Sequence, residues 1–366
     1  MNFAYVRLLL ATAFLILCLA GLLNYVVDPA GIYREPGWSP RAYAYLLHKA
    51  EYGLWAPSGK INERLLAKEK CRYLNSIEGV VIGSSHVMSI SSLRIPPSLH
   101  NICQSIQNLG VSGGSIEDHL TLAYLALRQV EQGKKCILGI DPWTFAFGKD
   151  ARYSTYRNDY DEARAEILLK AKPKYNLFSK IDVTKLSNLV NLEYTARSIK
   201  TAFNDYKSWP PIITQESFPN MAIGGKDSAY LKDGSIVYSA KYIADCNSTP
   251  IPIGGLTYKT DSPCNTKEGI EAYRILLLWI KDKGAEPILL MTPYHENVWK
   301  APSSLDVVAM RATEIIVLKL ARELNLRVVG SFDPVVAGCQ PSDFYDCMHT
   351  KPEGLAKLKI RTIATQ

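Results

Sequence analysis

Between residue 79 and the C-terminus, short apolar runs alternate with longer amphipathic segments. The runs are too short for helices, so we expect buried strands at 79–83, 105–111, 136–140, 287–291 and 326–329. Helical spacing predicts helices at 115–132, 267–284, 304–324 and 352–365. Strands that alternate with helices typically form a parallel sheet covered on both faces. The sequence therefore predicts a three-layer α/β fold.

The rest of the chain departs from this alternation. Residues 28–75 are aromatic and mixed in charge, with a helical stretch at 62–70, and we expect a stalk or collar there. The α/β domain is then expected over 76–366. Within it, residues 150–265 begin charged and helical and become rich in proline and glycine, which indicates an insertion.

The N-terminal segment contains no charged side chain from residue 8 to residue 27. About 20 apolar residues are enough to cross a bilayer as a helix. Arg7 precedes the segment, so the positive-inside rule predicts a cytoplasmic N-terminus, an anchor within 1–27 and an extracytoplasmic, periplasmic domain. The alternative is a cleaved signal peptide, for which the segment is long and Ala20–Gly21 is a weak cleavage site.

The chain has eight cysteines, and one of them, Cys18, lies in the apolar segment. Cys246 and Cys264 bracket a loop rich in Pro, Gly, Ser and Thr, and Cys339 and Cys347 bracket a shorter loop. We predict these two pairs as disulfides, which suit an oxidising compartment. No cysteines are spaced as CxxC, so we expect no zinc site.

The net charge is +7, but the lysines and arginines are scattered along the chain. Nucleic-acid-binding domains concentrate such residues on one face or segment, so we expect no nucleic acid partner. A weakly basic face would suit an anionic membrane or glycan, although an ordinary solvated surface explains the same charge.

Two separated motifs carry groups that suit nucleophilic catalysis. Ser85 follows the first predicted strand, in Gly83-Ser84-Ser85-His86, where a tight turn would expose its hydroxyl near backbone N–H groups. Asp346 precedes His349 by three residues, between the last predicted strand and helix. Such a carboxylate can orient an imidazole that takes the serine proton. Each motif alone is also compatible with an ordinary loop.

Other polar residues follow the predicted strands at the same edge of the sheet. Asn108 and Gly110 end the second strand, and Tyr294 and His295 follow the fourth. The carboxyl ends of parallel strands are the usual place of a binding site. Tyr294 and His295 are therefore candidates for substrate contact, with simple loop packing as the alternative.

Together, the motifs resemble those of the SGNH (GDSL-like) hydrolase superfamily, over about 79–145 and 267–360. The resemblance implies a flavodoxin-like sheet, a Ser85–His349–Asp346 triad, and an oxyanion hole to which the Ser85 and Gly110 N–H groups contribute. One position departs, because Asp141 stands where the family has an asparagine donor. An ionised carboxylate cannot donate a hydrogen bond. Either Asp141 has another role, such as substrate contact, or the oxyanion hole uses the Ser85 and Gly110 backbones with a different donor, for which Asn108 is a candidate.

With its N-terminal anchor, the layout is similar to the DltD-like branch and related polysaccharide O-acylation proteins. This implies a serine esterase or O-acyltransferase that acts on acyl groups of a cell-envelope polymer, beside a membrane-bound O-acyltransferase and without metal or organic cofactor. The alternative is a non-catalytic glycan-binding or assembly subunit of such a complex. The departure from the family pattern at Asp141 favours this hypothesis.

Overall fold

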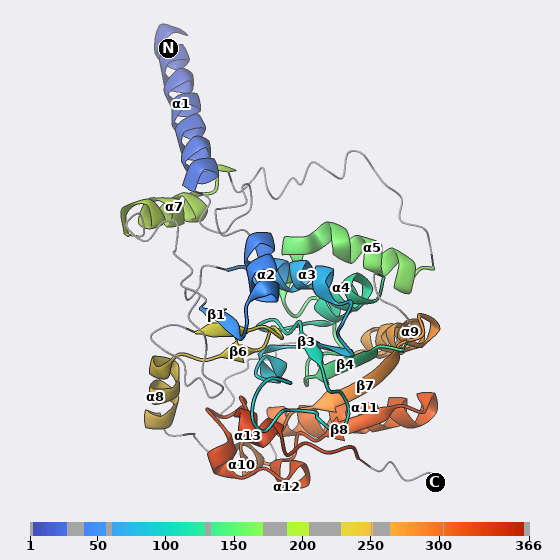
Figure 1. The fold of residues 1–366 in the computed structure, drawn as a ribbon. Helices are drawn as coiled ribbons and strands as arrows, with labels where there is room; N and C mark the ends of the chain where they lie inside the picture. Colours follow the sequence, from blue (N-terminus) through green and yellow to red (C-terminus); the bar gives the residue numbers. More distant parts are fainter. Residues whose placement is uncertain are drawn as a thin grey trace.

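The computed structural model describes residues 3–27, 40–55, 61–128, 133–170, 189–204, 228–249, 251, 264–302 and 304–361. At its centre is an α/β domain with a five-stranded parallel sheet (Figure 1). Its strands are β2 (Gly79–Ile82), β3 (Ile106–Asn108), β4 (Lys135–Ile140), β7 (Glu286–Met291) and β8 (Arg327–Gly330). All five lie where the apolar runs predict them.

The order of the strands across the sheet is β3-β2-β4-β7-β8, and every neighbouring pair is parallel. β3 therefore lies on one side of β2, while β4 and the later strands lie on the other side, so the strand order switches direction between β2 and β4. In doubly wound sheets, the crevice at the carboxyl ends next to such a switch point is where ligands bind. Ser85 follows β2 at this point.

Both faces of the sheet are buried. Val80 and Ile82 of β2 pack in one apolar cluster while Val81 packs in another, and Ile137 and Leu138 of β4 divide in the same way. A strand buried on both faces needs apolar side chains at successive positions. This explains why the sequence of each of these strands is a continuous apolar run.

Four longer helices pack in the domain: α4 (Ile116–Leu127), α5 (Arg157–Ile167), α9 (Lys267–Asp282) and α11 (Leu305–Leu324). Helices were predicted at three of these places, although residues 129–132 of the first lie outside the described residues. Ser304 begins α11 by accepting a hydrogen bond from the Val307 N–H at 3.3 Å, which satisfies one otherwise unpaired donor of the first turn.

The predicted C-terminal helix is wrong beyond its first turn. Helix α13 covers only Pro352–Leu355, and the chain then returns to the sheet. Ile360 bridges Val329 of β8, and the Arg361 N–H donates to the Val328 carbonyl at 2.8 Å. The edge strand β8 offers free backbone groups, and pairing with them outweighs the helical preference of the sequence.

The described part of 28–75 packs against the domain instead of forming a separate stalk. Helices α2 (Pro40–Lys49) and α3 (Glu63–Lys70), the turn η1 (Cys71–Tyr73) and strand β1 (Gly53–Trp55) all contribute buried side chains, including Tyr43, Leu54 and Leu66. Strand β1 pairs with β5 (Ala229–Leu231), which pairs with β6 (Ile236–Val237). The predicted collar and the predicted insertion thus share a three-stranded sheet.

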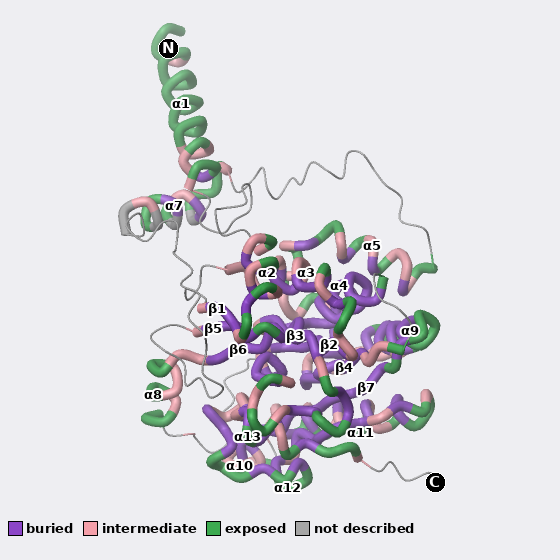
Figure 2. The backbone as a smooth tube through the Cα atoms, in the orientation of Figure 1, coloured by how far each residue is buried: buried purple, intermediate pink, exposed green. Residues whose placement is uncertain are grey.

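Helix α1 (Phe3–Val27) stands away from the domain, and Figure 2 shows it as almost wholly exposed. It is long and apolar enough to span a membrane, with a mean hydropathy of 2.5 in its most apolar window. Its last turns contact α7 (Leu192–Asn204), a helix of the insertion. The remaining elements are η3 (Ala151–Tyr156), α8 (Ala240–Ser248), α10 (Glu296–Trp299), α12 (Pro334–Ala337) and η6 (Pro341–Asp343).

Candidate active site

Ser85 opens the short turn η2 (Ser85–Val87) immediately after β2. The Ser84 hydroxyl accepts a hydrogen bond from the His86 N–H at 3.2 Å, which fixes the turn. Gly83 lies against β4, where an added Cβ would stand 3.2 Å from the Gly139 Cα. The tight approach of the two strands at this point therefore favours glycine.

Ser85, His349 and Asp346 form a continuous chain of contacts. The Ser85 Oγ lies 2.9 Å from His349 Nε2, and His349 Nδ1 lies 2.7 Å from Asp346 Oδ2. An ionised carboxylate only accepts hydrogen bonds, so Nδ1 carries the proton and Nε2 is left to accept from the serine. The structure thus brings together the three residues predicted as a triad.

Asp346 is held in place by further donors. Its Oδ1 accepts from the backbone N–H groups of Met348 and His349, each at 2.8 Å. The Tyr242 hydroxyl donates to Oδ2 at 3.2 Å. Burial alone would raise the pKa of Asp346, but the hydrogen bond and charge of His349 and the two backbone donors outweigh it and lower the pKa to about 2. The carboxylate is therefore ionised across the physiological pH range.

The predicted roles of Asn108 and Gly110 as oxyanion donors are not supported. The Asn108 Nδ2 donates to the carbonyls of Val87 and Ile90, at 2.7 and 2.9 Å, and its Oδ1 accepts from the Gly110 N–H at 2.8 Å. Both groups are thus used to hold the loop after Ser85 against the end of β3. The Ser85 N–H, by contrast, has no acceptor among the described residues.

Asp141 faces His86 rather than the substrate side of the site. Asp141 Oδ1 lies 2.7 Å from His86 Nδ1, and the two side chains are 2% and 1% exposed. This distance is within ion-pair range, but the contact is not aligned as a hydrogen bond, and neither side chain has another hydrogen-bond partner among the described residues. The prediction that Asp141 contacts substrate is not supported, because the carboxylate is buried against His86, the residue that follows Ser85.

The His86 ring also packs edge-on against His349, with ring centroids 5.3 Å apart. The buried pair of His86 and Asp141 therefore lies directly beside the triad, and His86 follows Ser85 in the sequence. It was not predicted as a pair, because His86 and Asp141 belong to different strand ends and only the switch-point geometry brings them together.

Tyr294 and His295 are buried in local packing, which favours the packing alternative over substrate contact. Tyr294 is 1% exposed and packs edge-on against His86 at 5.2 Å. His295 is 6% exposed, and its Nδ1 accepts from the Asn297 N–H at 3.1 Å to begin α10. Burial lowers the pKa of His295 and favours the neutral ring that this acceptor role needs.

An aromatic cluster from the insertion lines the other side of the triad. Tyr238 stacks on Tyr242 at 4.6 Å, packs against Tyr345 at 5.4 Å and lies 6.5 Å from the His349 ring, measured between ring centroids. The sequence offered no periodic or spacing signal for this contact. Only the docking of the β5–β6 hairpin, through the Ile236 N–H and the Met88 carbonyl at 2.7 Å, places these tyrosines here.

Neither predicted disulfide is present, since Cys246, Cys339 and Cys347 are thiols. Cys339 belongs to one apolar cluster of the sheet, while Cys347 packs against the other. The two side chains of that pair are therefore directed into separate parts of the core, which sequence distance alone does not reveal. Among the described residues, no three His, Cys, Asp or Glu side chains are grouped as metal ligands.

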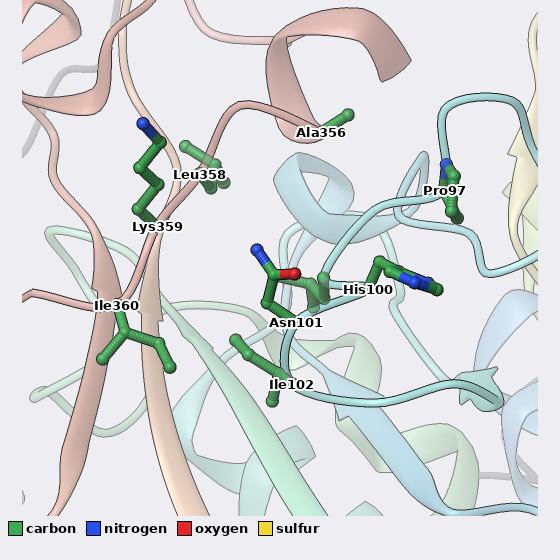
Figure 3. A pocket seen from close by; sticks show the side chains of 9 residues that line it. Pro97, His100, Asn101, Ile102, Ala356, Leu358, Lys359 and Ile360 are labelled. Atoms are coloured by element: carbon green, nitrogen blue, oxygen red, sulfur yellow. The ribbon is translucent and has the colours of Figure 1, made fainter.

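A cavity of about 250 Å³ lies elsewhere on the domain (Figure 3). One part of its lining precedes β3 and the other follows α13: Pro97, Leu99, His100, Asn101 and Ile102, and Ala356, Leu358, Lys359 and Ile360. Because it lies before the amino end of β3, it is distinct from the site at the carboxyl ends.

Comparison with known proteins adds no assignment: no protein-family model and no curated protein matches this chain. The site's chemistry therefore has to be inferred from its residues.

Proposed function

We propose that this chain is a membrane-anchored, extracytoplasmic serine esterase or O-acyltransferase of the SGNH three-layer type. The observation that supports it is the Ser85–His349–Asp346 chain, with contacts of 2.9 and 2.7 Å. Acyl transfer through serine needs a hydroxyl, an imidazole in the correct tautomer and an ionised carboxylate, arranged in this order.

In the proposed reaction, the Ser85 Oγ attacks the acyl carbonyl while His349 Nε2 takes its proton. The tetrahedral oxyanion is bound by the Ser85 N–H, the available donor at the turn. Collapse of this intermediate breaks the ester bond, and His349 returns the proton to the leaving alcohol. Water or a sugar hydroxyl then attacks the Ser85 ester, with His349 again as base.

The proposed substrate class is the acyl groups of a cell-envelope polysaccharide, with a membrane-bound O-acyltransferase as partner. The support is the resemblance of the motifs together with an N-terminal helix apolar enough to cross a membrane. Arg7 before this helix supports an extracytoplasmic domain.

A second candidate is a non-catalytic glycan-binding or assembly subunit. Two features favour it: Asp141 replaces the family's asparagine donor, and Asn108 and Gly110 bond to each other. Both leave the oxyanion with few donors, and removing one such donor from a serine hydrolase costs about 10²–10³ in rate.

Hydrolysis of p-nitrophenyl acetate by the purified chain separates the two candidates. We expect Ser85→Ala to lower the rate by at least about 10³-fold, as the loss of a triad nucleophile does. The comparison variant is Ser84→Ala, which removes the cap hydroxyl of the same turn but none of the three triad side chains, so we expect a much smaller loss. Equal rates for Ser85→Ala and wild type would contradict the enzyme and favour the subunit. Labelled acyl groups recovered on glycan, and not only as free acid, would identify a transferase.

A further inference from the structure

Helix α7 is fixed to the last turns of α1 by a buried polar contact. The Asn24 side chain is fully buried, and its Nδ2 donates to the Leu189 carbonyl and to the Thr195 hydroxyl, both at 2.8 Å. One turn earlier, Gly21 faces the Leu189 backbone, where an added Cβ would lie 3.7 Å from the carbonyl oxygen. The chain therefore places α7 against α1 and not against the sheet.

This contact fixes the depth of α7 relative to a bilayer that α1 crosses. A helix of 25 residues rises about 37 Å, and the hydrocarbon core of a bilayer is about 30 Å thick. Gly21 and Asn24 belong to the final two turns of α1, so α7 meets it near the boundary of the hydrocarbon. Figure 1 shows that α7 runs across the axis of α1, which is the direction of a membrane plane if α1 crosses the bilayer.

The two sides of α7 differ in polarity and burial. Tyr194 and Ser198 are buried, and Thr195 contacts Asn24. Leu192, Ala196 and Ile199 are exposed, and their spacing puts them in one strip along the helix. Leu192 is 87% exposed and Ile199 is 45% exposed. No described part of the protein covers this apolar strip, and α1, which contacts α7, also exposes apolar side chains.

We propose that α7 is an interfacial helix, whose strip of Leu192, Ala196 and Ile199 is buried in the outer leaflet of the bilayer that α1 crosses. Amphipathic helices bind there with the apolar face in the acyl boundary and basic side chains toward the headgroups. Exposed Lys200, beside Ile199, suits such a headgroup contact. The proposal rests on the membrane anchoring proposed above and is independent of the chemistry of Ser85.

Photocross-linking of the full chain in lipid nanodiscs tests it. A photoactivatable diazirine amino acid replaces Leu192 or Ile199, one at a time, and lipid adducts are measured by mass spectrometry. Ile315 on α11 is the matched control, because it is an isoleucine that is 67% exposed on the α/β domain. We expect at least tenfold more lipid adduct at 192 and 199 than at 315.

The same probe at Phe14, which is 69% exposed on α1, reports whether the anchor is inserted. Lipid adducts at 14 with only control levels at 192 and 199 would overturn the proposal while leaving the anchor intact. Cross-links from 192 or 199 to a second copy of the chain would overturn it in favour of a protein interface. Ile199→Glu should reduce the adduct at 192 severalfold and leave ester hydrolysis unchanged, and an unaltered adduct would also count against membrane contact.

Discussion

At the scale of single residues, Asp346 orients His349, the base of the proposed mechanism. Its carboxylate accepts from His349 Nδ1 and from two backbone N–H groups. In Asp346→Asn, the amide would face Nδ1 with a donor or with a weaker acceptor and would favour the wrong tautomer. We expect kcat for ester hydrolysis to fall by about 10³–10⁴-fold, with KM changed little. A loss no greater than threefold would show that His349 is oriented by other groups.

The depressed pKa of Asp346 also gives a sign for its pH dependence. Because the pKa is lowered to about 2 in the folded chain, the carboxylate stabilises the fold above the pKa of about 4 that it has when unfolded. That contribution is lost progressively as the pH falls from about 4 to about 2. Any loss of activity between pH 7 and pH 4 must therefore come from a different group.

His86 and Asp141 are the residues for which a substitution cycle is most informative. His86→Leu leaves a carboxylate buried without its partner, which typically costs about 3–5 kcal/mol of unfolding free energy. Adding Asp141→Asn removes that charge, so we expect the double variant to recover at least about 1 kcal/mol. Denaturant unfolding of the four chains measures this coupling. Strictly additive losses would show that the contact of 2.7 Å carries no stabilising charge pairing.

The triad was predictable from sequence, but the surroundings were not. The strands that precede Ser85, Asp346 and His349 are recognisable in the sequence as apolar runs. It could therefore be inferred that the three residues lie at the same edge of the sheet. Whether a polar residue at that edge faces substrate or the core depends on side-chain direction, which no pattern encodes. For that reason the structure reassigns Asp141 and His295 to the interior.

At the scale of elements, the insertion supplies part of the site. Strand β5 pairs with β1, far away in the sequence, and the hairpin that follows leads to α8 and Tyr242. Such pairing between distant short segments leaves no periodic signal, so the sequence indicated only an insertion. A contribution of this region to the site is therefore visible only in the structure, from the contact of Tyr242 with Asp346.

Tyr242→Phe tests this contribution. It removes one hydrogen bond, of 3.2 Å, to an ionised carboxylate that keeps its other donors. A hydrogen bond to a charged group contributes about 1.5–3 kcal/mol, so we expect kcat to fall by about 10–150-fold. The matched control is Tyr345→Phe, which changes a tyrosine of the same cluster that does not bond Asp346. Identical rates in both variants would limit α8 to packing.

At the scale of the whole molecule, Lys70 joins three distant parts of the chain. It lies at the end of α3, and its Nζ donates to the Asn108 carbonyl of β3 at 2.5 Å and to the Gly234 carbonyl of the inserted hairpin at 3.4 Å. Burial lowers the pKa of Lys70 to about 8, and the nearby charges of Cys71, Asp233 and Glu63 offset only part of this. The folded chain therefore binds this proton more weakly than the unfolded chain.

The consequence is a stability that rises with pH. Between about pH 8 and the unfolded pKa of about 10.4, the unfolded state holds more protons at this site, so the free energy of unfolding increases with pH by up to about 3 kcal/mol. Lys70→Met removes this dependence, while Lys68→Met, a partly exposed lysine on the same helix, should retain it. Thermal unfolding of the three chains from pH 7 to pH 10 measures the difference, in which the other titrating groups cancel. If the stability of wild type and of Lys70→Met changes with pH in parallel, Lys70 binds its proton equally well in the folded and unfolded chains. Burial of Lys70 between the sheet and the insertion would then have no effect on its protonation.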